Sequence, residues 1–575
     1  MITVTIEGKE IQTEPHKTII EAAFENGIYI PHFCWHPDLA VSGNCRMCLV
    51  EVENMPKQVI ACMTRCTDGM VVSVNSEKAI DAREAVMEFI LINHPLDCPI
   101  CDEAGECKLQ DYTYKYSIGE SRFDEEKNLK RKRVELGPEV MFDAERCISC
   151  SRCIRFCEEK VGDPQLTFVE RGDRVTIETF PGKKLDNPYS MNVIDICPVG
   201  ALTSTQFRFK ARVWDMASTE NVCPGCARGC SMNIWTRQNE ILRLTPRENQ
   251  YVNDFWMCDN GRLNSFKHTK ENRVKEPSIK RDGVHTEVTW DEAIATVVGE
   301  LKHYTKGQVA IIGSPYDMTE DAYALRKFAD EVVQTPYLGI IEHRVEGDDD
   351  DFLIRSDKTP NMLGAKLAGV PSTDARYGLP GIIDALKDGS IRVLIVTDRN
   401  AFDNKELVEA IGDTVYVIAI VSNTSELTER AEVVLASATF AEKLGTFVNE
   451  QGHMQLLRPA VVTSENQRWM GGYSVSRLDK FGSEFDRWGQ IYRHDCRATW
   501  KIVAGIARVM GVDWGYLHPE DIFEEMSEKV DELKGLTYEA LGRRGVTIIG
   551  DPKEWLVPYA YEDVTQKSVL RTARV

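Results

Sequence analysis

The sequence predicts a multidomain protein of the α+β and α/β classes, and three observations support this prediction. The chain has 575 residues, enough for about four domains of ~150 residues each. Seventeen of its 18 cysteines lie between Cys34 and Cys258, which sets a cysteine-rich front part apart from the rest. From about Val284 onward, short apolar runs alternate with helix-like segments, a pattern typical of parallel βαβ units.

The composition excludes several classes of protein. Hydrophobic residues make up 43% and charged residues 28% of the chain, as in ordinary globular proteins. The net charge of −21 argues against a nucleic-acid partner, because the phosphate backbone favours basic surfaces. The longest apolar run, residues 415–421, is far shorter than the ~20 residues of a membrane span. The start at Met1 shows no signal-peptide pattern, so we expect membrane association only through a partner.

The cysteines are too sparse for a disulfide scaffold, yet they cluster. Clustered cysteines in a chain whose thiols stay reduced indicate metal binding. Four groups are present, each with its own spacing, and each is expected to define a domain.

The first group has the spacing C-x10-C-x2-C-x13-C and consists of Cys34, Cys45, Cys48 and Cys62. Upstream, residues 2–6 alternate apolar with polar, which predicts a strand, and residues 17–26 predict a helix closed by Gly27. Residues 1–78 resemble a plant-type [2Fe–2S] ferredoxin, although the plant-type spacing begins C-x4-C. The ten-residue loop is instead similar to the variant that opens the large iron–sulfur subunits of complex I.

Three alternatives concern this first domain. Cys66 is a second candidate for the fourth ligand, but the stretch 61–64 around Cys62 matches the family better. A Rieske centre would need a histidine beside Cys48, where Leu49 stands. We expect His32 and His36 to serve in packing.

The second group, spaced H-x3-C-x2-C-x5-C, consists of His94, Cys98, Cys101 and Cys107. It follows a predicted amphipathic helix over residues 77–93, which Pro95 ends. Three thiolates and one imidazole suit either a [4Fe–4S] cluster or zinc. Residues 79–118 resemble the one-histidine, three-cysteine cluster domain of the complex I and iron hydrogenase families, which favours iron–sulfur.

The third group is C-x2-C-x2-C with a remote Cys-Pro: Cys147, Cys150, Cys153 and Cys197. This is the bacterial ferredoxin pattern for one [4Fe–4S] cluster, and it predicts a ferredoxin-like domain over residues 139–206. Cys157 extends the run, but no second triplet exists near Cys197 to form another cluster. We therefore expect Cys157 to be a buried or free thiol.

The fourth group, C-x2-C-x3-C-x27-C, consists of Cys223, Cys226, Cys230 and Cys258. Residues 216–272 resemble the [4Fe–4S] domain that opens molybdopterin oxidoreductases. A zinc ribbon is the alternative.

Residues 273–575 are expected to form an α/β domain. Residues 309–312, 393–396 and 415–420 predict strands, and residues 320–332 and 405–411 predict helices. The stretches 288–293 and 442–449 resemble the molybdopterin oxidoreductase fold. Active members of that family offer Ser, Cys or selenocysteine to the metal, whereas no cysteine lies between Cys258 and Cys496 and the chain is short. We expect a truncated domain without molybdenum cofactor, and no dinucleotide or NTP motif occurs.

The order of these four cysteine domains resembles the large iron–sulfur subunits of complex I type NADH–quinone oxidoreductases. That resemblance implies one [2Fe–2S] and three [4Fe–4S] clusters, no catalytic residues, and electron relay from a flavin- and NADH-binding partner subunit toward quinone. It also implies other peripheral-arm subunits as partners, indirect contact with the membrane arm, and a peripheral location on the cytoplasmic side of the inner membrane. Two alternatives stay open: an electron-transfer subunit of a soluble NAD-linked formate dehydrogenase or hydrogenase, and a zinc-stapled scaffold without redox function.

Overall fold

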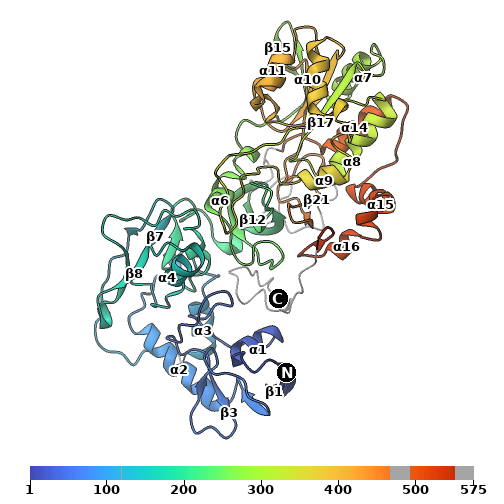
Figure 1. Ribbon diagram of the computed structural model, residues 1–575. Coiled ribbons are helices and arrows are strands. Elements are labelled where there is room, and N and C mark those ends of the chain that lie inside the picture. Colours follow the sequence, from blue (N-terminus) through green and yellow to red (C-terminus); the bar gives the residue numbers. More distant parts are fainter. Residues whose placement is uncertain (118, 467–492, 551–575) are drawn as a thin grey trace, which may run out of the picture. The chain divides into compact units, whose positions relative to one another are not determined.

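The computed structural model describes residues 1–117, 119–466 and 493–550. The described part of the chain divides into two compact units, one formed by residues 1–216 and the other by residues 217–550 (Figure 1). Across the described ranges, no helix is long and apolar enough to cross a membrane.

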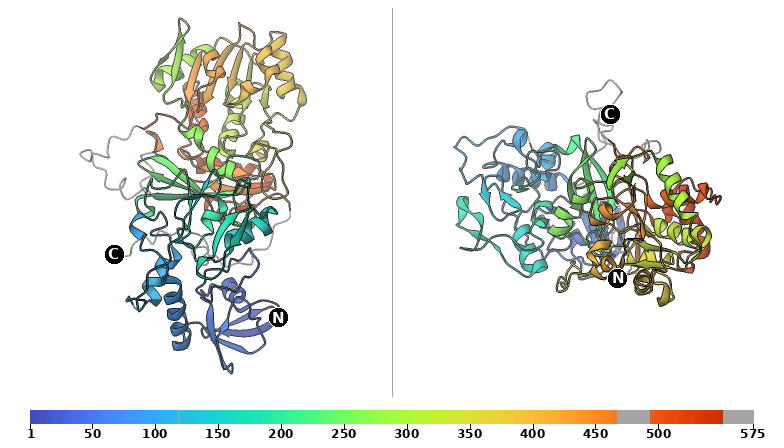
Figure 2. Two further views of the ribbon diagram at one scale, coloured as in Figure 1. Left: turned by 90° about the vertical axis from the view of Figure 1, so that its left-hand side faces the viewer. Right: turned by 90° about the horizontal axis from the view of Figure 1, so that it is seen from above.

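The first unit begins with a five-stranded sheet in the order β2-β1-β5-β3-β4. The blue arrows near the N-terminus in the left view of Figure 2 belong to this sheet. Strands β1 and β5 are parallel, and the other pairs are antiparallel. Val4 and Ile6 are buried while Thr3 and Thr5 are partly exposed, so the alternation expected for this strand is present. The strands are β1 (Ile2–Ile6), β2 (Lys9–Thr13), β3 (Leu49–Val52), β4 (Val59–Ile60) and β5 (Met70–Ser73).

Helix α1 (Ile19–Glu25) shares one hydrophobic core with this sheet. Its start is fixed by a capping box, in which the Thr18 amide donates to the Glu21 carboxylate at 2.8 Å and the Glu21 amide donates to the Thr18 hydroxyl at 3.4 Å. The helix predicted over residues 17–26 is therefore present, two residues shorter at its start.

Two helices follow, α2 (Glu77–Leu91) and α3 (Lys108–Tyr116). Helix α2 is tied to the sheet by the buried Arg83, which donates to the Leu49 carbonyl at 3.0 Å. It ends at Leu91, shortly before the predicted end at residue 93.

The rest of the first unit combines two small antiparallel sheets with two short helices. A three-stranded sheet has the order β10-β7-β6, and β8 pairs with β9. Helix α4 carries Cys153, and α5 ends shortly before Cys197. The elements are β6 (Val134–Glu135), β7 (Val140–Phe142), α4 (Arg152–Phe156), β8 (Leu166–Val169), β9 (Thr176–Thr179), α5 (Asn192–Asp195) and β10 (Leu202–Ser204).

The second unit opens with an antiparallel sheet, β11-β12-β13, followed by α6. Cys223 directly follows β11, Cys230 directly precedes β12, and Cys258 is the N-cap of α6. The bounds are β11 (Ala217–Val222), β12 (Ser231–Arg237), β13 (Glu240–Pro246) and α6 (Asp259–Asn264).

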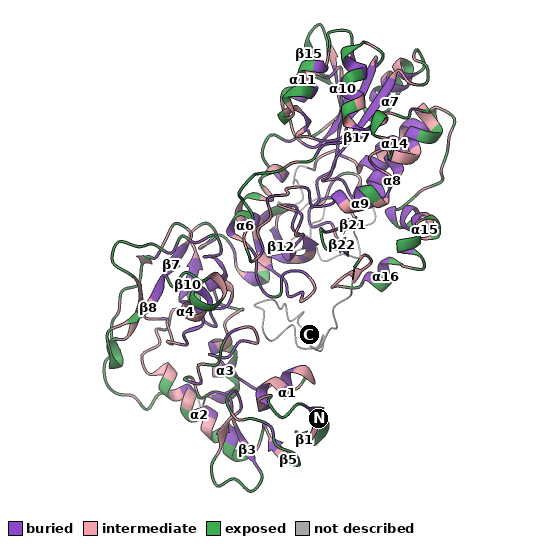
Figure 3. Ribbon diagram, viewed as in Figure 1, coloured by how far each residue is buried: buried purple, intermediate pink, exposed green. Residues whose placement is uncertain are grey.

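A seven-stranded sheet in the order β15-β14-β20-β19-β18-β16-β17 forms the centre of the second unit. The strands from β16 to β20 pair in parallel, which confirms the predicted α/β class. Strands β16, β18 and β20 are buried at every residue (Figure 3). The strands are β14 (Ser278–Arg281), β15 (Val284–Glu287), β16 (Val309–Gly313), β17 (Leu338–Ile340), β18 (Val393–Val396), β19 (Tyr416–Val421) and β20 (Val433–Ala436).

Helices connect these strands, and a last small sheet, β21-β22-β23, completes the unit. The predicted helix over 320–332 is present as α8 followed by a π-helical turn over Phe328–Val333. The elements are α7 (Trp290–Leu301), α8 (Thr319–Lys327), α9 (Met362–Leu367), α10 (Leu379–Lys387), α11 (Lys405–Ala410), α12 (Glu426–Arg430), β21 (Gly445–Val448), β22 (His453–Leu457), α14 (Thr499–Val509), α15 (Pro519–Lys529), α16 (Tyr538–Leu541) and β23 (Val546–Thr547).

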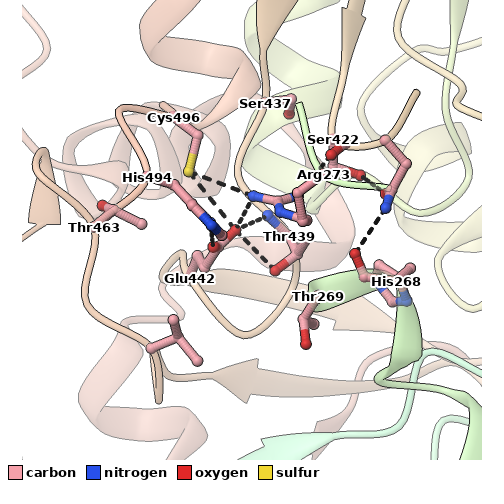
Figure 4. Close-up of polar contacts among 12 residues, drawn as sticks. His268, Thr269, Arg273, Ser422, Ser437, Thr439, Glu442, Thr463, His494 and Cys496 are labelled. Carbon is pink, nitrogen blue, oxygen red and sulfur yellow. Dashed lines mark hydrogen bonds and ion pairs between the residues drawn. The ribbon is translucent and has the colours of Figure 1, made fainter. Parts of the chain in front are cut away.

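The loop after β20 is held by a buried polar network centred on Glu442 (Figure 4). Arg273 donates to the Glu442 carboxylate at 2.8 Å, and both side chains are fully buried. The Thr439 amide and hydroxyl donate to the same carboxylate at 2.7 and 2.9 Å, and His494 Nδ1 lies 3.2 Å from it. Burial alone would raise the pKa of Glu442, but Arg273 and these hydrogen bonds lower it to about 2.

The neighbouring Lys443 is buried as well and forms ion pairs with Asp317 at 3.1 Å and Asp321 at 2.5 Å. Two consecutive charged residues of this loop therefore each have buried partners of opposite charge. These contacts explain why the first two residues of the stretch 442–449 are charged yet buried.

Candidate iron–sulfur sites

The first cysteine group converges in loops beside the N-terminal sheet. The side chains of Cys34 and Cys45 are hydrogen-bonded, as are those of Cys48 and Cys62. The Cys34 amide also donates to Cys45 Sγ at 3.4 Å. Arg46 adopts a left-handed conformation, φ 62°, which turns the chain between Cys45 and Cys48.

The thiols of this group differ in acidity. The hydrogen bond from Cys45 is the largest influence on Cys34 and lowers the pKa of its thiol to about 5, against the opposing effect of burial. The hydrogen bond to Cys34 and burial raise the pKa of Cys45 well above its usual range. Cys66 has a different environment, because burial and the carboxylates of Glu21 and Glu25 on α1 raise its pKa to about 11.

The second group brings its three cysteines together at the loop before α3. The negative charge of Cys98 acts on Cys101, and that of Cys101 acts on Cys107. Cys98 is exposed, whereas Cys101 is buried.

Residues about 100 positions downstream enclose this loop. The Lys108 amide donates to the Pro198 carbonyl at 3.1 Å. A Cβ atom added at Gly200 would collide with Cys101 Sγ, and one at Gly105 would lie 2.7 Å from Val213. Arg212 donates to the carbonyls of Pro99 and Cys101. The second site is therefore completed by the following segment of the same unit.

His94 lies at the end of α2, near a different set of groups. Burial lowers the pKa of its imidazole to about 4, with a further lowering by Arg146. Its side chain lines an open cavity of ≈460 Å³, together with Cys45 and Cys147. A neutral imidazole is the form that ligates metal, so the protonation state suits a ligand, while its placement with Cys98, Cys101 and Cys107 stays a prediction.

The third group surrounds a small enclosed cavity. All four predicted cysteines line it, with apolar neighbours that include Phe142 and Ile177; the four are Cys147, Cys150, Cys153 and Cys197. Ser149 and Ser151 take left-handed conformations, φ 53° and 64°, and these turns direct the loop cysteines to one side. The structure therefore places the four residues of this group along the lining of one cavity.

Cys157 lies outside that cavity lining, at the start of the π-helical turn that follows α4. It is fully buried, and burial with the nearby Asp163 carboxylate raises its pKa to about 12. Asn187 hydrogen-bonds to its sulfur. This environment is that of a neutral packed thiol.

The fourth group is held between β11, β12 and α6. The four cysteines lie close enough to interact electrostatically: negative charge on Cys226 and Cys258 raises the pKa values of Cys223 and Cys230. The Gly261 amide donates to Cys258 Sγ at 3.2 Å. A Cβ atom at Gly261 would lie 3.1 Å from Cys223 Sγ and 3.2 Å from Cys258 Sγ, so the absence of a side chain there leaves room between these two sulfurs.

The donor chemistry of these sites fits iron–sulfur clusters. Burial is the largest influence on the loop thiols of the third group and on the thiols of the fourth, and it raises their pKa values, to about 11 for Cys150 and about 12 for Cys147 and Cys258; these thiols are Cys147, Cys150, Cys153, Cys223, Cys226, Cys230 and Cys258. Buried thiolates gathered in one place need a cationic centre to neutralise them, and iron ions supply that charge. Among the described residues, no three His, Cys, Asp or Glu side chains already form a site for a single metal ion.

Sequence reasoning missed several residues that shape these sites. Arg152 and Arg155 lie within or just after the third cysteine run. A positive side chain among several cysteines could have indicated that these arginines help to shape the site. Arg212 and Gly200 belong to no sequence motif. Their roles become visible only in the fold, where the segment that contains them lies against the loop of the second cysteine group.

The fold and the cysteine groups are those of ferredoxin-type iron–sulfur domains that precede a molybdopterin-oxidoreductase-type domain. Family comparisons agree. Residues 1–77 match the 2Fe-2S iron-sulfur cluster binding domain, 83–122 the NADH-ubiquinone oxidoreductase-G iron-sulfur binding region, and 137–203 the ferredoxin-like domain of NADH-quinone oxidoreductase subunit 3. Residues 216–267 match the molybdopterin oxidoreductase Fe4S4 domain and 273–346 the molybdopterin oxidoreductase family. The predicted fold class is thereby confirmed.

Three named proteins are similar to this chain in sequence. The G subunit of NADH-quinone oxidoreductase from Rickettsia conorii is 37% identical over 337 residues, covering 59% of this chain and 50% of that protein. The NADH-ubiquinone oxidoreductase 75 kDa subunit of Reclinomonas americana is 41% identical over 320 residues, covering 55% of this chain and 46% of that protein. The G subunit of the Streptomyces coelicolor NADH-quinone oxidoreductase is 37% identical over 356 residues, with 61% and 42% covered.

The chain spans about half the length of these curated relatives. A solved structure of NAD+-reducing [NiFe]-hydrogenase in the H2-reduced state is also similar, with 28% identity, a TM-score of 0.34, and coverage of 37% of this chain and 91% of that one. The predicted resemblance to the large iron–sulfur subunits of complex I is confirmed by the named relatives.

Proposed function

We propose that this chain is the electron-relay subunit of a complex I type NADH–quinone oxidoreductase. The observation that supports this most directly is the presence of four cysteine groups in one chain, each within a segment that an iron–sulfur family model matches. In this proposal electrons enter from a flavin- and NADH-binding partner subunit and leave toward quinone through other peripheral-arm subunits.

The proposed ligands follow the four groups. One [2Fe–2S] cluster would be held by Cys34, Cys45, Cys48 and Cys62. Three [4Fe–4S] clusters would be held by His94 with Cys98, Cys101 and Cys107; by Cys147, Cys150, Cys153 and Cys197; and by Cys223, Cys226, Cys230 and Cys258. When bound, each cluster would accept and release one electron at a time.

The chain's own residues would set the conditions for that relay. The thiols are enclosed by apolar side chains such as Phe142 and Ile177 around the third group, which excludes water. Main-chain amides such as that of Gly261 donate to sulfur. Hydrogen bonds to sulfur, burial and local charge are the features by which proteins tune cluster potentials.

We further propose that residues 273–575 hold no molybdenum cofactor and act as a scaffold. The support is in the sequence, where no cysteine lies between Cys258 and Cys496. The location we propose is peripheral, on the cytoplasmic side of the inner membrane, with contact to the membrane arm made through other subunits and with no nucleic-acid partner.

The decisive experiment extracts native membranes gently with detergent and follows this chain through native electrophoresis and size-exclusion chromatography. We expect it to co-migrate with NADH–quinone reductase activity, with a flavin-bearing subunit and with membrane subunits. An affinity-tagged copy, expressed in the same cells and tested for the same activity after pull-down, provides the control for chance co-migration.

Two other outcomes contradict the proposal. Recovery in the soluble fraction with a hydrogenase or formate dehydrogenase would assign the clusters to a soluble electron-transfer complex. A colourless protein with zinc and without acid-labile sulfide would assign the cysteines to a structural scaffold.

A further inference from the structure

The loop between Cys34 and Cys45 is longer than a plant-type ferredoxin requires. It contains ten residues, where the plant-type pattern has four. The structure shows what the extra length contacts: the third cysteine group, through α4 and the residues on either side of it.

Arg152, the first residue of α4, bridges two cysteine groups. Its guanidinium donates through Nη2 to the Trp35 carbonyl and through Nη1 to the Ile196 carbonyl at 3.1 Å. Trp35 follows Cys34 of the first group, and Ile196 precedes Cys197 of the third. One planar cation therefore joins the peptide next to a ligand of each group.

Arg155 makes a second bridge one turn along the helix. It donates to the carbonyls of Cys34 and Ala40. Its Nε donates to the Ser151 hydroxyl at 3.1 Å, and that hydroxyl lies 3.1 Å from the hydroxyl of Ser42. Arg155 therefore contacts the loop between Cys34 and Cys45 directly, and it contacts the third cysteine group through Ser151.

Three further contacts join the same two segments. Asn44 donates to the Ser149 carbonyl at 3.0 Å. The Ala40 amide donates to the Glu159 carboxylate at 2.7 Å. Lys160 forms an ion pair with Asp38 at 2.5 Å. The loop from Trp35 to Asn44 is consequently docked along its whole length.

The two arginines bring positive charge to both groups. Arg152 is 7% exposed, and neither arginine takes part in any ion pair with Asp or Glu among the described side chains. A buried cation needs a compensating negative charge, and a reduced iron–sulfur cluster in either group would supply it.

We propose that Arg152 and Arg155, with the loop 35–44 that they hold, form a clamp that fixes the distance between the first and third clusters and raises the reduction potential of both. The two arginines are positioning residues. The inference rests on the proposed function, because it presupposes clusters in both groups. A positive charge favours the reduced form of a cluster, which carries one more negative charge, so removing the clamp should make both clusters harder to reduce.

The test compares Arg155→Gln with Arg155→Lys, and Arg152→Met with Arg152→Lys, in the full chain purified with its clusters. Redox titration followed by EPR measures each cluster separately, and relaxation enhancement between the two signals reports their spacing. We expect the neutral variants to lower the equilibrium constant for reduction of both clusters about tenfold, or about 59 mV for one electron. The lysine variants, which keep the charge and lose the planar fork, should retain the potentials but alter the spacing.

Arg212→Gln is the matched control. Arg212 also donates to carbonyls of a cysteine loop, but to those of the second group, so this variant should leave the potentials of the first and third clusters unchanged. A neutral substitution that shifts only one of these two clusters, or neither, would overturn the clamp. So would lysine variants that behave like the neutral ones in potential.

Iron and acid-labile sulfide are determined on every preparation first. If the unmodified chain carries no iron–sulfur clusters, the proposed function itself fails. If the unmodified chain carries the clusters, and the neutral variants keep their iron and show the same reduction potentials as the unmodified chain, only the clamp fails.

Discussion

Replacing Glu442 with glutamine should destabilise the centre of the second unit by about 3.5 kcal/mol. The magnitude follows from the lowered pKa of Glu442, about 2 in the folded chain against an ordinary value of 4.5, at about 1.4 kcal/mol per pKa unit. It agrees with the cost of about 3–5 kcal/mol for removing one partner of a buried ion pair. Glutamine keeps the size but leaves the fully buried Arg273 without its anion.

Because the chain has two units, global unfolding is not two-state, and native-state hydrogen exchange with mass spectrometry is the suitable assay. Peptides that cover residues 433–448 should exchange on the order of a hundredfold faster in Glu442→Gln. The control is Glu292→Gln, which breaks the half-exposed pair of Glu292 with Arg281 and should change exchange less than about threefold.

The same network predicts a pH dependence. A carboxyl group with a lowered pKa stabilises the fold fully above its unfolded value, near 4.5, and this stabilisation is lost as the pH falls toward about 2. The difference between the unmodified chain and the variant, corrected for intrinsic exchange rates, should therefore shrink between pH 4.5 and pH 2. Equal exchange in both proteins at neutral pH would refute the reasoning.

Three further predictions concern the metal sites. His94→Cys should keep iron in the second site and lower that cluster's potential, since a thiolate replaces a neutral ligand; an unchanged EPR titration would contradict the assignment. Gly261→Ala should remove about four iron atoms per chain, because the added methyl would crowd Cys223 and Cys258; Gly299→Ala, where nothing lies within 4 Å of the added atom, should keep them. Elemental analysis should find no stoichiometric molybdenum or tungsten, and one equivalent per chain would disprove the scaffold role of residues 273–575.

Features with a local signal were predictable from the sequence. The strands at 309–312 and 393–396 are apolar runs buried on both faces, and the structure has them as β16 and β18. The cysteine groups could be recognised in the sequence because most members of each group recur at short, characteristic spacings. The third group needed only its triplet and Cys-Pro; its four residues line one cavity, and their role as cluster ligands stays a prediction.

Features built from distant residues were not predictable. Arg273 and Glu442 are 169 residues apart, and each alone is expected at the surface. Arg152 could be suspected of acting on its own cysteine group, but its donation to Trp35, 117 residues away, requires the fold. The ten-residue loop departs from the plant-type spacing. Its contacts with the third cysteine group, which only the structure shows, explain what the extra residues do.

The enclosure of the second site has a consequence for how the chain is made. Cys98, Cys101 and Cys107 leave the ribosome well before Pro198, Gly200 and Arg212, which close over them. During synthesis these thiols are uncovered until the later segment has been made, whereas N-terminal domains otherwise tend to finish first. A cluster at the second site, as proposed above, would therefore be enclosed only when the first unit is complete, and a fragment that stops near residue 122 would carry the three cysteines without their cover.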